Sequence, residues 1–548
     1  MKYQSPLESM YQWESEIPDQ VYLREPIQGK YHEITWAETA RQTRKMAAYL
    51  KSLDLPSNSK ISILSKNCSH WFISDLAIMM SGHITIPLYP NLTSDNLKLI
   101  LEHSETVVAF VGKLDNYDEL KSGIPEGITC ISYPYYPREQ HLQWDKVTED
   151  IDPIEENVIR DPDDTATIMY TSGTTGIPKG VMHRFYNYSY AIYHAMKEEN
   201  FQQGERFISY LPLCHIAERM LVQIGSLHVG GTVSFAESID TFAKNLQEST
   251  MTVFLAVPRI WEKFQQGILT KLPQKKLNLL LSIPIISGII KGKIKKTLGL
   301  TGAKHIYTGA AAAAPSLLEF FAKLGIHIQE AYAMTENTCY SHVNRRNDIQ
   351  IGSVGQAFPN CDVRISEDGE IQVKHEALMT GYYKEPKLTK ETFTADGYLR
   401  TGDEGIVDEN GFLRITGRLK DLFKTSKGKY IAPVPIEMMI MESEDIDQVC
   451  IVGVGLPQPM VLCILSELGL KKSAEEMDTD LGSLVSSINS QLDLHEEIAK
   501  MVVLKEEWTP ENEILTPTLK VKRKEIDKRY SENYEKWYGE EGTVVWTE

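Results

Sequence analysis

Residues 170–180, rich in glycine and hydroxyl side chains, have the composition of a loop that binds phosphate. They read Tyr-Thr-Ser-Gly-Thr-Thr-Gly-Ile-Pro-Lys-Gly and follow residues 166–169, whose side chains are compatible with a β-strand. Glycines let backbone N–H groups surround an anion, the hydroxyls add hydrogen-bond donors, and Lys179 adds a mobile positive charge. The segment is not a P-loop, because Gly180 stands where Ser or Thr would hold Mg²⁺. The alternative is a flexible turn of glycine and threonine.

Further strings make the chain resemble the adenylate-forming superfamily, which includes acyl-CoA synthetases, luciferases and peptide-synthetase adenylation domains. They are Tyr-Ala-Met-Thr-Glu at 332–336, Leu-Arg-Thr-Gly-Asp at 399–403 and Gly-Arg-Leu-Lys-Asp-Leu at 417–422. Ala333 stands where the family has glycine. Each string alone also fits an ordinary turn, but four motifs in the expected order make coincidence negligible. The resemblance covers essentially the whole chain and implies ATP, Mg²⁺ and coenzyme A as cofactors.

The resemblance also implies which residues surround ATP. The expected nucleotide contacts are Thr171, Ser172, Gly173, Thr174, Thr175, Gly176, Lys179, Gly309, Ala310, Ala311, Glu330, Ala331, Tyr332, Thr335, Asp403, Arg418, Lys420, Lys424 and Lys520. Among them, Thr335 would touch the α-phosphate, and Glu336 with Thr171 would hold Mg²⁺. Asp403 would bind both ribose hydroxyls, because a carboxylate offers two acceptor oxygens to a vicinal diol.

The adenine side of this site is expected at residues 308–315, Thr-Gly-Ala-Ala-Ala-Ala-Ala-Pro, which are similar to the family's S-G-A-A-P. Small side chains there would let the adenine ring lie against backbone, while the ring of Tyr332 stacks on it. Ala312 replaces the family's proline. The alternative for an alanine run is the start of a close-packed helix.

Three strings resemble the long-chain fatty acyl-CoA synthetases within the superfamily. They are Leu-Pro-Leu-Cys-His-Ile-Ala-Glu-Arg at 211–219, Thr-Ser-Lys-Gly-Lys-Tyr-Ile-Ala-Pro at 425–433 and Leu-Thr-Pro-Thr-Leu-Lys-Val-Lys-Arg at 515–523. In the first, His215 would lie near the reacting carboxylate; alone, it would more often be a buried core histidine. In the third, Lys520 takes the position of the adenylation lysine. The predicted catalytic residues are therefore Lys520, His215, Glu336 and Thr335.

The patterns between these motifs predict the elements that position them. Strand patterns at 60–64, 84–88 and 106–111 alternate with a helix at 71–80 and a helix that Thr93 or Ser94 caps. Such alternation favours a layered α/β unit with a mostly parallel sheet. From residue 362 short strands and tight turns follow, with Asp-Gly at 368–369 and 396–397 and Asn-Gly at 410–411, which are hairpin signals.

With the resemblance, these patterns predict an α/β fold of two unequal domains. Residues 1–417 form a large N-terminal adenylation domain of layered α/β subdomains with a small β-barrel-like part. Residues 418–421 form a hinge, and residues 422–548 a smaller, mobile α+β domain. By resemblance, rotation about Lys420 withdraws Lys520 after the adenylate forms and presents a face that guides the CoA thiol.

Composition narrows the function classes. The 548 residues include 57 basic and 75 acidic side chains, a net charge of −18, which argues against a nucleic-acid partner. The scattered cysteines, Cys68, Cys130, Cys214, Cys339, Cys361, Cys450 and Cys463, favour reduced thiols over a disulfide framework or zinc site. The N-terminal residues lack the charged start and apolar run of a signal peptide, so a cytoplasmic location is expected.

Residues 271–296 are a candidate peripheral membrane contact. Their apolar stretch, 277–290, is interrupted by Pro284 and Gly288 and flanked by lysine-rich runs. It is shorter than the roughly 18 apolar residues that a spanning helix needs. The hypothesis is a patch that rests on the inner, anionic face of a membrane; the alternative is a buried helix–turn segment with solvated flanks.

The sequence therefore predicts a long-chain fatty acid–CoA ligase that works through an acyl-adenylate. One alternative keeps the adenylate but delivers the acyl group to a carrier protein. A second is a luciferase-like oxygenase with the same adenylation apparatus. A third is a non-catalytic nucleotide- or acyl-binding regulator, although Lys179, Glu336, Asp403, Arg418 and Lys520 are all present.

Overall fold

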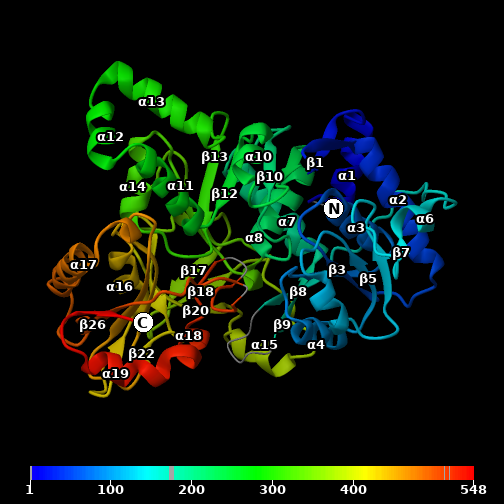
Figure 1. Ribbon diagram of the computed structural model, residues 1–548. Helices are drawn as coiled ribbons and strands as arrows, with labels where there is room; N and C mark the ends of the chain where they lie inside the picture. Colours follow the sequence, from blue (N-terminus) through cyan, green and yellow to red (C-terminus); the bar gives the residue numbers. More distant parts are fainter. Residues whose placement is uncertain (1–2, 172–177, 511, 517–518, 548) are drawn as a thin grey trace.

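The computed structural model describes residues 3–171, 178–510, 512–516 and 519–547 of the chain (Figure 1). It is a mixed α/β structure with a large N-terminal part and a smaller C-terminal part, drawn in orange and red at the lower left of Figure 1. The predicted fold class is therefore confirmed.

The first large sheet contains the predicted strands at 60–64, 84–88 and 106–111. Its strands run in the order β19-β9-β8-β4-β3-β5-β6-β7. The bounds are β3 (Lys60–Leu64), β4 (Ile84–Leu88), β5 (Thr106–Val111), β6 (Thr129–Ser132), β7 (Leu142–Gln143), β8 (Thr165–Thr171), β9 (Lys179–Arg184) and β19 (Gly381–Tyr382). β3 pairs in parallel with both β4 and β5, as the βαβ alternation predicted.

Two helices that join these strands confirm the local patterns. α3 (Ser69–Met80) begins two residues before the predicted range and is buried along its whole length, because α2 (Trp36–Ser52) packs on it. A helix that is largely apolar around its circumference requires such cover. α4 (Ser94–Ser104) starts after Thr93, whose hydroxyl accepts a hydrogen bond from the backbone N–H of Asn96 at 3.3 Å.

The second large sheet, in the order β16-β15-β14-β13-β12-β10-β11-β1-β2, carries the other nucleotide motifs. Its bounds are β1 (Val21–Ile27), β2 (Lys30–Thr35), β10 (Arg206–Ser209), β11 (Thr232–Phe235), β12 (Val253–Ala256), β13 (His305–Gly309), β14 (Gln329–Tyr332), β15 (His342–Val343) and β16 (Gln356–Ala357). The parallel strands β12, β13 and β14 end at the same edge, which brings residue 309 beside residues 331–332.

The third sheet, in the order β17-β18-β20-β21, is the small barrel-like part. It is antiparallel and consists of β17 (Asp362–Ile365), β18 (Glu370–Lys374), β20 (Leu399–Val407) and β21 (Leu413–Arg418). Gly369 and Gly411 have φ angles of +81° and +84° in the turns between paired strands. Glycine adopts this left-handed conformation without a steric penalty, so the predicted hairpin signals are confirmed.

The C-terminal part is built on the sheet β24-β25-β26-β27. Its strands are β24 (Ile446–Val452), β25 (Met460–Leu465), β26 (Lys500–Val503) and β27 (Val544–Trp546), preceded by the hairpin β22 (Phe423–Lys424) and β23 (Tyr430–Ile431). Alternate side chains of β25 enter separate apolar clusters, with Val461 and Cys463 on one face and Leu462 and Ile464 on the other. This sheet therefore has its own core.

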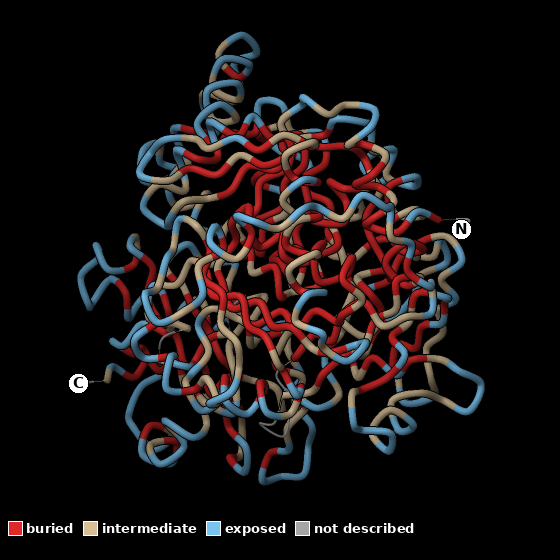
Figure 2. The backbone as a smooth tube through the Cα atoms, turned by 90° about the vertical axis from the view of Figure 1, so that its right-hand side faces the viewer, coloured by how far each residue is buried: buried red, intermediate tan, exposed pale blue. Residues whose placement is uncertain are grey.

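Helices cover these sheets, and most exposed backbone lies at the periphery (Figure 2). The remaining helices are α1 (Pro6–Glu16), α5 (Tyr117–Leu120), α6 (Trp144–Thr148), α7 (Phe185–Glu198), α8 (Ile216–Glu218), α9 (Gly225–Val229), α10 (Phe242–Ser249), α11 (Pro258–Lys271), α12 (Gln274–Leu281), α13 (Pro284–Thr297), α14 (Pro315–Lys323), α15 (Pro386–Thr392), α16 (Pro433–Ile440), α17 (Ala474–Asn489), α18 (Arg523–Tyr530) and α19 (Tyr534–Gly539). Within the described residues, no helix has both the length and the apolar character needed to cross a bilayer.

Candidate active site

The predicted phosphate loop joins β8 to β9 at the carboxyl end of β8. Thr171 and Lys179 are register partners at the base of this antiparallel pair. Because β8 runs parallel to β4, the loop leaves the sheet at the edge where ligands of α/β proteins commonly bind. The predicted contacts Ser172, Gly173, Thr174, Thr175 and Gly176 lie outside the described residues.

Tyr382 connects the lysine of this loop to the predicted metal carboxylate. The ammonium group of Lys179 lies 5.4 Å from the centre of the Tyr382 ring. The hydroxyl of Tyr382 donates a hydrogen bond of 2.7 Å to Oε1 of Glu336. Burial, together with the charge of Glu336, raises the pKa of Tyr382 well above its usual value, so the hydroxyl stays a neutral donor.

Glu336 and Thr171 fit a magnesium site by their chemistry. Glu336 lies with Thr335 in a 3₁₀ turn, Thr335–Asn337, that follows β14. A carboxylate and a hydroxyl are oxygen donors, the kind of ligand that Mg²⁺ prefers. Among the described residues only Tyr382 donates to the Glu336 carboxylate, which leaves Oε2 available.

Asp403 is the centre of the predicted ribose site. Its buried carboxylate accepts a hydrogen bond of 2.7 Å from the Tyr332 hydroxyl at Oδ2. At Oδ1 it accepts one of 2.8 Å from Nε of Arg418, its register partner across β20 and β21. Burial and the charge of Asp403 raise the pKa of Tyr332, which keeps it a donor. The predicted nucleotide residues Tyr332, Asp403 and Arg418 therefore lie in direct contact.

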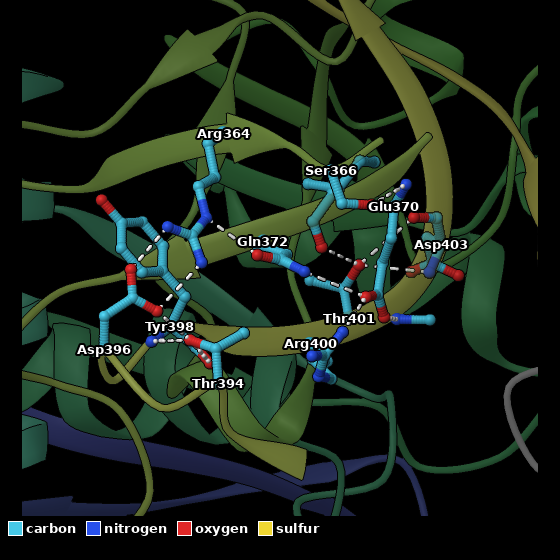
Figure 3. A network of polar contacts seen from close by, with 12 residues as sticks. Arg364, Ser366, Glu370, Gln372, Thr394, Asp396, Tyr398, Arg400, Thr401 and Asp403 are labelled. Atoms are coloured by element: carbon cyan, nitrogen blue, oxygen red, sulfur yellow. Dashed lines mark hydrogen bonds and ion pairs between the residues drawn. The ribbon is translucent and has the colours of Figure 1, made fainter. Parts of the chain in front are cut away.

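A polar network on the third sheet fixes the backbone on which Asp403 lies (Figure 3). Glu370 of β18 accepts a hydrogen bond from the backbone N–H of Gly402 at 3.0 Å and pairs with Arg400 at 3.2 Å. The Thr401 hydroxyl donates to the carbonyl of Ile371 at 2.7 Å. β20 is thus held to β18 by side chains as well as by the strand ladder.

Lys520 reaches the same site from the C-terminal part. Its backbone carbonyl accepts a hydrogen bond of 2.7 Å from the Thr516 N–H, and residues 515 and 521 form a β-bridge. Burial and the nearby Arg418 charge lower the pKa of the Lys520 amino group to about 8, whereas Asp403 acts in the opposite direction. The lysine therefore interacts electrostatically with Asp403 and Arg418, two of the predicted nucleotide residues.

His215 interacts electrostatically with Lys520. It is the N-cap of α8, where its Nδ1 accepts a hydrogen bond from the Ala217 N–H at 3.3 Å. Burial and the charge of Lys520 lower the pKa of His215 to about 3. The imidazole is therefore neutral near pH 7, which suits a hydrogen-bonding group better than a cation.

The rest of the His215 motif enters the core. The fully buried Arg219 starts a π-helical segment, Arg219–Ile224, and forms a 2.7 Å ion pair with the equally buried Asp75 of α3. Burial raises the pKa of Glu218 to about 8, although its Oε1 accepts from the Tyr210 N–H at 3.0 Å. Glu218 and Arg219 therefore make core contacts, whereas His215 interacts with Lys520.

Small residues bring β13 and β14 together on the predicted adenine side. A side chain at Gly309 would have its Cβ 2.7 Å from the carbonyl oxygen of Ala331, so the close approach requires glycine. Ala310 has a φ of +68°, and Ala311 is exposed. The alanine run precedes α14, which begins at Pro315, so it is not a helix start. Burial raises the pKa of Glu330 to about 8.

Lys420 and Lys424 lie on the exposed surface and make no described contact with the other nucleotide residues. Lys420 occupies a turn closed by a hydrogen bond of 2.9 Å from the Asp421 N–H to the Arg418 carbonyl. The ammonium group of Lys424 lies 5.1 Å from the ring centre of Tyr430. Their predicted roles stay predictions.

A second arginine pair joins the two parts of the molecule. Arg259, in the first turn of α11, donates hydrogen bonds to both carboxylate oxygens of Asp447, at 2.9 and 2.5 Å, and to its carbonyl oxygen at 2.5 Å. Asp447 belongs to β24 of the C-terminal sheet. This ion pair therefore links the C-terminal part to the N-terminal part.

Tyr382 and the Arg259–Asp447 pair are absent from the residues that the sequence predicted. The only sequence signal for Tyr382 is its place in Gly-Tyr-Tyr at 381–383. That signal has no meaning until β19 pairs with β9 and brings the ring beside Lys179. No local signal links Arg259 to Asp447, which are 188 residues apart.

Comparisons with known proteins agree with this arrangement. The AMP-binding enzyme family matches residues 12–383, and the AMP-binding enzyme C-terminal domain matches residues 420–542. FadD15 of Mycobacterium bovis, a long-chain-fatty-acid–CoA ligase, is 28% identical over an alignment that covers 97% of this chain and 96% of the relative. The peroxisomal long chain acyl-CoA synthetase 6 of Arabidopsis thaliana is 29% identical, with 94% and 82% covered.

A solved structure supports the fold. The adenylation domain of a carboxylic acid reductase from Segniliparus rugosus, in complex with AMP and a co-purified carboxylic acid, superimposes with a TM-score of 0.81. The two chains are 20% identical, and the match covers 97% of this chain and 94% of the other. The likeness extends over both the N-terminal and the C-terminal parts.

Proposed function

Because the chain belongs to the AMP-binding enzyme family, we propose that it joins a long-chain fatty acid to coenzyme A through an acyl-adenylate made from ATP. The observation that carries the proposal is the position of Lys520, whose buried amino group interacts electrostatically with the hydrogen-bonded Asp403–Arg418 pair and with His215. The long-chain relatives support the substrate class, and the AMP bound to the solved adenylation domain supports the nucleotide.

In the first step a fatty carboxylate oxygen attacks the α-phosphorus of ATP. A P–O bond forms to the carboxylate while the bond to the β-phosphate breaks, so that acyl-AMP and pyrophosphate result. Two anions must meet, and positive groups must offset their repulsion. Lys520 provides a charge where the carboxylate and phosphate meet, and Lys179 provides one at the departing pyrophosphate. Bound Mg²⁺ would neutralise phosphate charge when held by Glu336 and Thr171.

Asp403 and its partners orient the nucleotide in this proposal. Arg418 and Tyr332 already donate to the Asp403 carboxylate, so its position is set before ATP arrives. Such preorganisation means that binding does not have to reorganise the site during reaction. The neutral imidazole of His215 would hydrogen-bond to the carboxylate end of the fatty acid.

In the second step the CoA thiol attacks the acyl carbonyl, and AMP leaves. We propose that residues 422–548 rotate as a unit about residues 418–421, relative to residues 1–417, and so withdraw Lys520. The separate core of the C-terminal sheet supports movement as one body. The hinge turn at Lys420 is exposed, which supports a role in bending.

The cysteines support a location. Each cysteine of the chain is a free thiol in the structure. Free thiols persist in reducing compartments, so we place the enzyme in the cytoplasm.

The test is pyrophosphate release from ATP and Mg²⁺, measured with acids of graded length and with or without CoA. Continuous turnover that needs CoA and peaks with long-chain acids is the expected result. A single burst of acyl-AMP that CoA does not relieve would instead favour a carrier protein as acceptor. ATP binding without pyrophosphate release with any acid would favour the non-catalytic regulator and contradict the proposal.

A further inference from the structure

An apolar surface lies exposed where α12 turns into α13, at the upper left of Figure 1. Ile285 and Ile289 of α13 have relative exposures of 81% and 65%, and Leu279 and Ile283 are also exposed. We call these four residues the docking surface. The opposite sides of the same helices pack on the core through Leu277, Ile290 and Ile294. The helices are thus anchored, and their outer side chains have no apolar cover among the described residues.

The outer face of α13 changes from apolar to basic along its length. Ile285 and Ile289 are four residues apart and therefore share one face of the helix. Gly288 and Gly292 lie between and beyond them, and a Cβ at either glycine would meet nothing within 4 Å. Lys293 and Lys296 follow on the exposed side of the same helix.

The charge around this surface is opposite to that of the whole chain. Residues 271–296 contain lysines and no acidic side chain, whereas the chain has a net charge of −18. The lysines are Lys271, Lys275, Lys276, Lys291, Lys293, Lys295 and Lys296. An occupant must therefore accept apolar side chains and carry negative charge beside them. An anionic bilayer meets both requirements, because acyl chains lie directly beneath lipid phosphates.

The shape and charge of the region disfavour the other occupants. The two helices project from the body of the N-terminal part in Figure 1, and a protruding turn suits the flat surface of a bilayer. A second copy of this chain would place the two lysine-rich surfaces opposite each other in a twofold interface, and like charges opposed in this way repel.

We propose that the α12–α13 turn docks on an anionic phospholipid bilayer. Leu279, Ile283, Ile285 and Ile289 enter the boundary between headgroups and acyl chains, while the surrounding lysines meet lipid phosphates. Each lysine near such a surface strengthens binding by roughly fivefold at moderate salt. The inference does not depend on the chemistry of the active site, which is formed by other elements.

Vesicle flotation of the full chain tests the proposal. The wild-type chain should float with vesicles of phosphatidylcholine and phosphatidylglycerol but not with phosphatidylcholine alone, and added salt should weaken the binding. Ile285→Asp with Ile289→Asp should lower the partition coefficient by roughly tenfold or more, because charge at these positions opposes insertion. The matched control is Ile239→Asp with Leu494→Asp, which changes two comparably exposed apolar residues elsewhere and should bind as wild type.

A second pair of variants separates charge from apolar contact. Lys293→Glu with Lys296→Glu should strongly weaken the preference for phosphatidylglycerol, because two of the seven lysines reverse their charge. Thermal unfolding of every variant verifies the fold, since the substituted side chains are exposed. Wild-type binding by the Ile285→Asp/Ile289→Asp variant, equal binding to neutral vesicles, or no vesicle binding at all would overturn the proposal. A change in oligomeric mass by light scattering with vesicle binding retained would assign the surface to contacts between copies, and would also overturn it.

Discussion

Two arginine–aspartate pairs of this molecule differ in how deeply they are buried and in what they connect. Asp75 and Arg219 both belong to the N-terminal part, and neither side chain is exposed to solvent. Arg259 and Asp447 join the N-terminal part to the C-terminal part, and their side chains keep exposures of 11% and 15%. The same type of ion pair therefore occurs once inside the core of the N-terminal part and once between the N-terminal and C-terminal parts.

The difference lies in what happens to the charges when a pair separates. Asp75 also accepts from Gln223 at 2.7 Å, and Arg219 lies over the rings of Trp71 and Tyr188, so neither charge could reach water without unfolding. The partners Arg259 and Asp447 would be hydrated if the C-terminal part rotated, and water would compensate both charges. The first pair suits a fixed core, and the second suits a contact that is made and broken during a two-step reaction.

The largest effect, on the free energy of unfolding, is expected from breaking the Asp75–Arg219 pair. Arg219→Met should lower the free energy of unfolding by about 3–5 kcal/mol, because it leaves the Asp75 carboxylate buried and unpaired. Urea unfolding followed by tryptophan fluorescence measures this loss. The control is Arg364→Met, whose partner Asp396 is exposed and whose loss should cost about 0–1 kcal/mol. Similar losses in the two variants would contradict the comparison.

The next largest effect is expected from removing Lys520, the residue that the C-terminal part contributes to the predicted active site. Lys520→Ala should slow ATP–pyrophosphate exchange by about 10²–10³-fold, because it removes a charge aimed at the transition state. Transfer from presynthesised acyl-AMP to CoA should keep its rate, since the proposed rotation withdraws this lysine. Lys524→Ala, an exposed neighbour, is the control and should leave both half-reactions unchanged. Equal loss of both half-reactions in Lys520→Ala would refute the assignment.

The strands and turns that depend on local sequence were easier to predict than the contacts between distant segments. The strands at 60–64, 84–88 and 106–111 have the predicted bounds, because short apolar runs between turn residues leave few alternatives. The hairpins at Gly369 and Gly411 were predictable for the same local reason, since their turns require a positive φ. The motif residues Tyr332, Asp403 and Arg418 lie together, as the common role that the resemblance implies predicts.

Contacts between distant segments were not predictable in the same way. Tyr382 acquires its place between Lys179 and Glu336 only through the pairing of β19 with β9. The pairing of Asp75 with Arg219 could not be predicted from sequence periodicity. Each is a single charged residue in its segment, and no repeating pattern links the two segments. Residues 172–176 lie outside the described residues, so their roles stay predictions.

A smaller effect is expected from breaking the pair between the two parts. Arg259→Met should slow ATP–pyrophosphate exchange by about tenfold, the equivalent of one charge-assisted hydrogen bond, because Lys520 would spend less time in the site. The free energy of unfolding and the rate of CoA transfer should change little. Lys263→Met, an exposed residue on the same helix, is the control. If Arg259→Met lost as much stability as Arg219→Met, the Arg259–Asp447 pair would also belong to a fixed core.

The pH dependence separates the lysine from the pair that helps to position it. The pKa of Lys520 is lowered to about 8, so its protonated form dominates below pH 8 and is lost as the pH rises through that value. The kcat/KM of adenylation, which reports groups of the free enzyme, should therefore halve near pH 8 and fall about tenfold for each further unit.

Two variants give this profile opposite signatures. Lys520→Arg should remove the alkaline fall, because a guanidinium stays protonated throughout this range, although the overall rate will be lower. Arg259→Met should keep the fall with the same midpoint, since the lysine that titrates is unchanged. His215 adds no inflection near pH 6.5, because burial and Lys520 hold its pKa near 3. An alkaline fall that persists in Lys520→Arg would mean that another group limits the reaction. The charge of Lys520 would then no longer explain why the C-terminal part must contact the N-terminal part during adenylation.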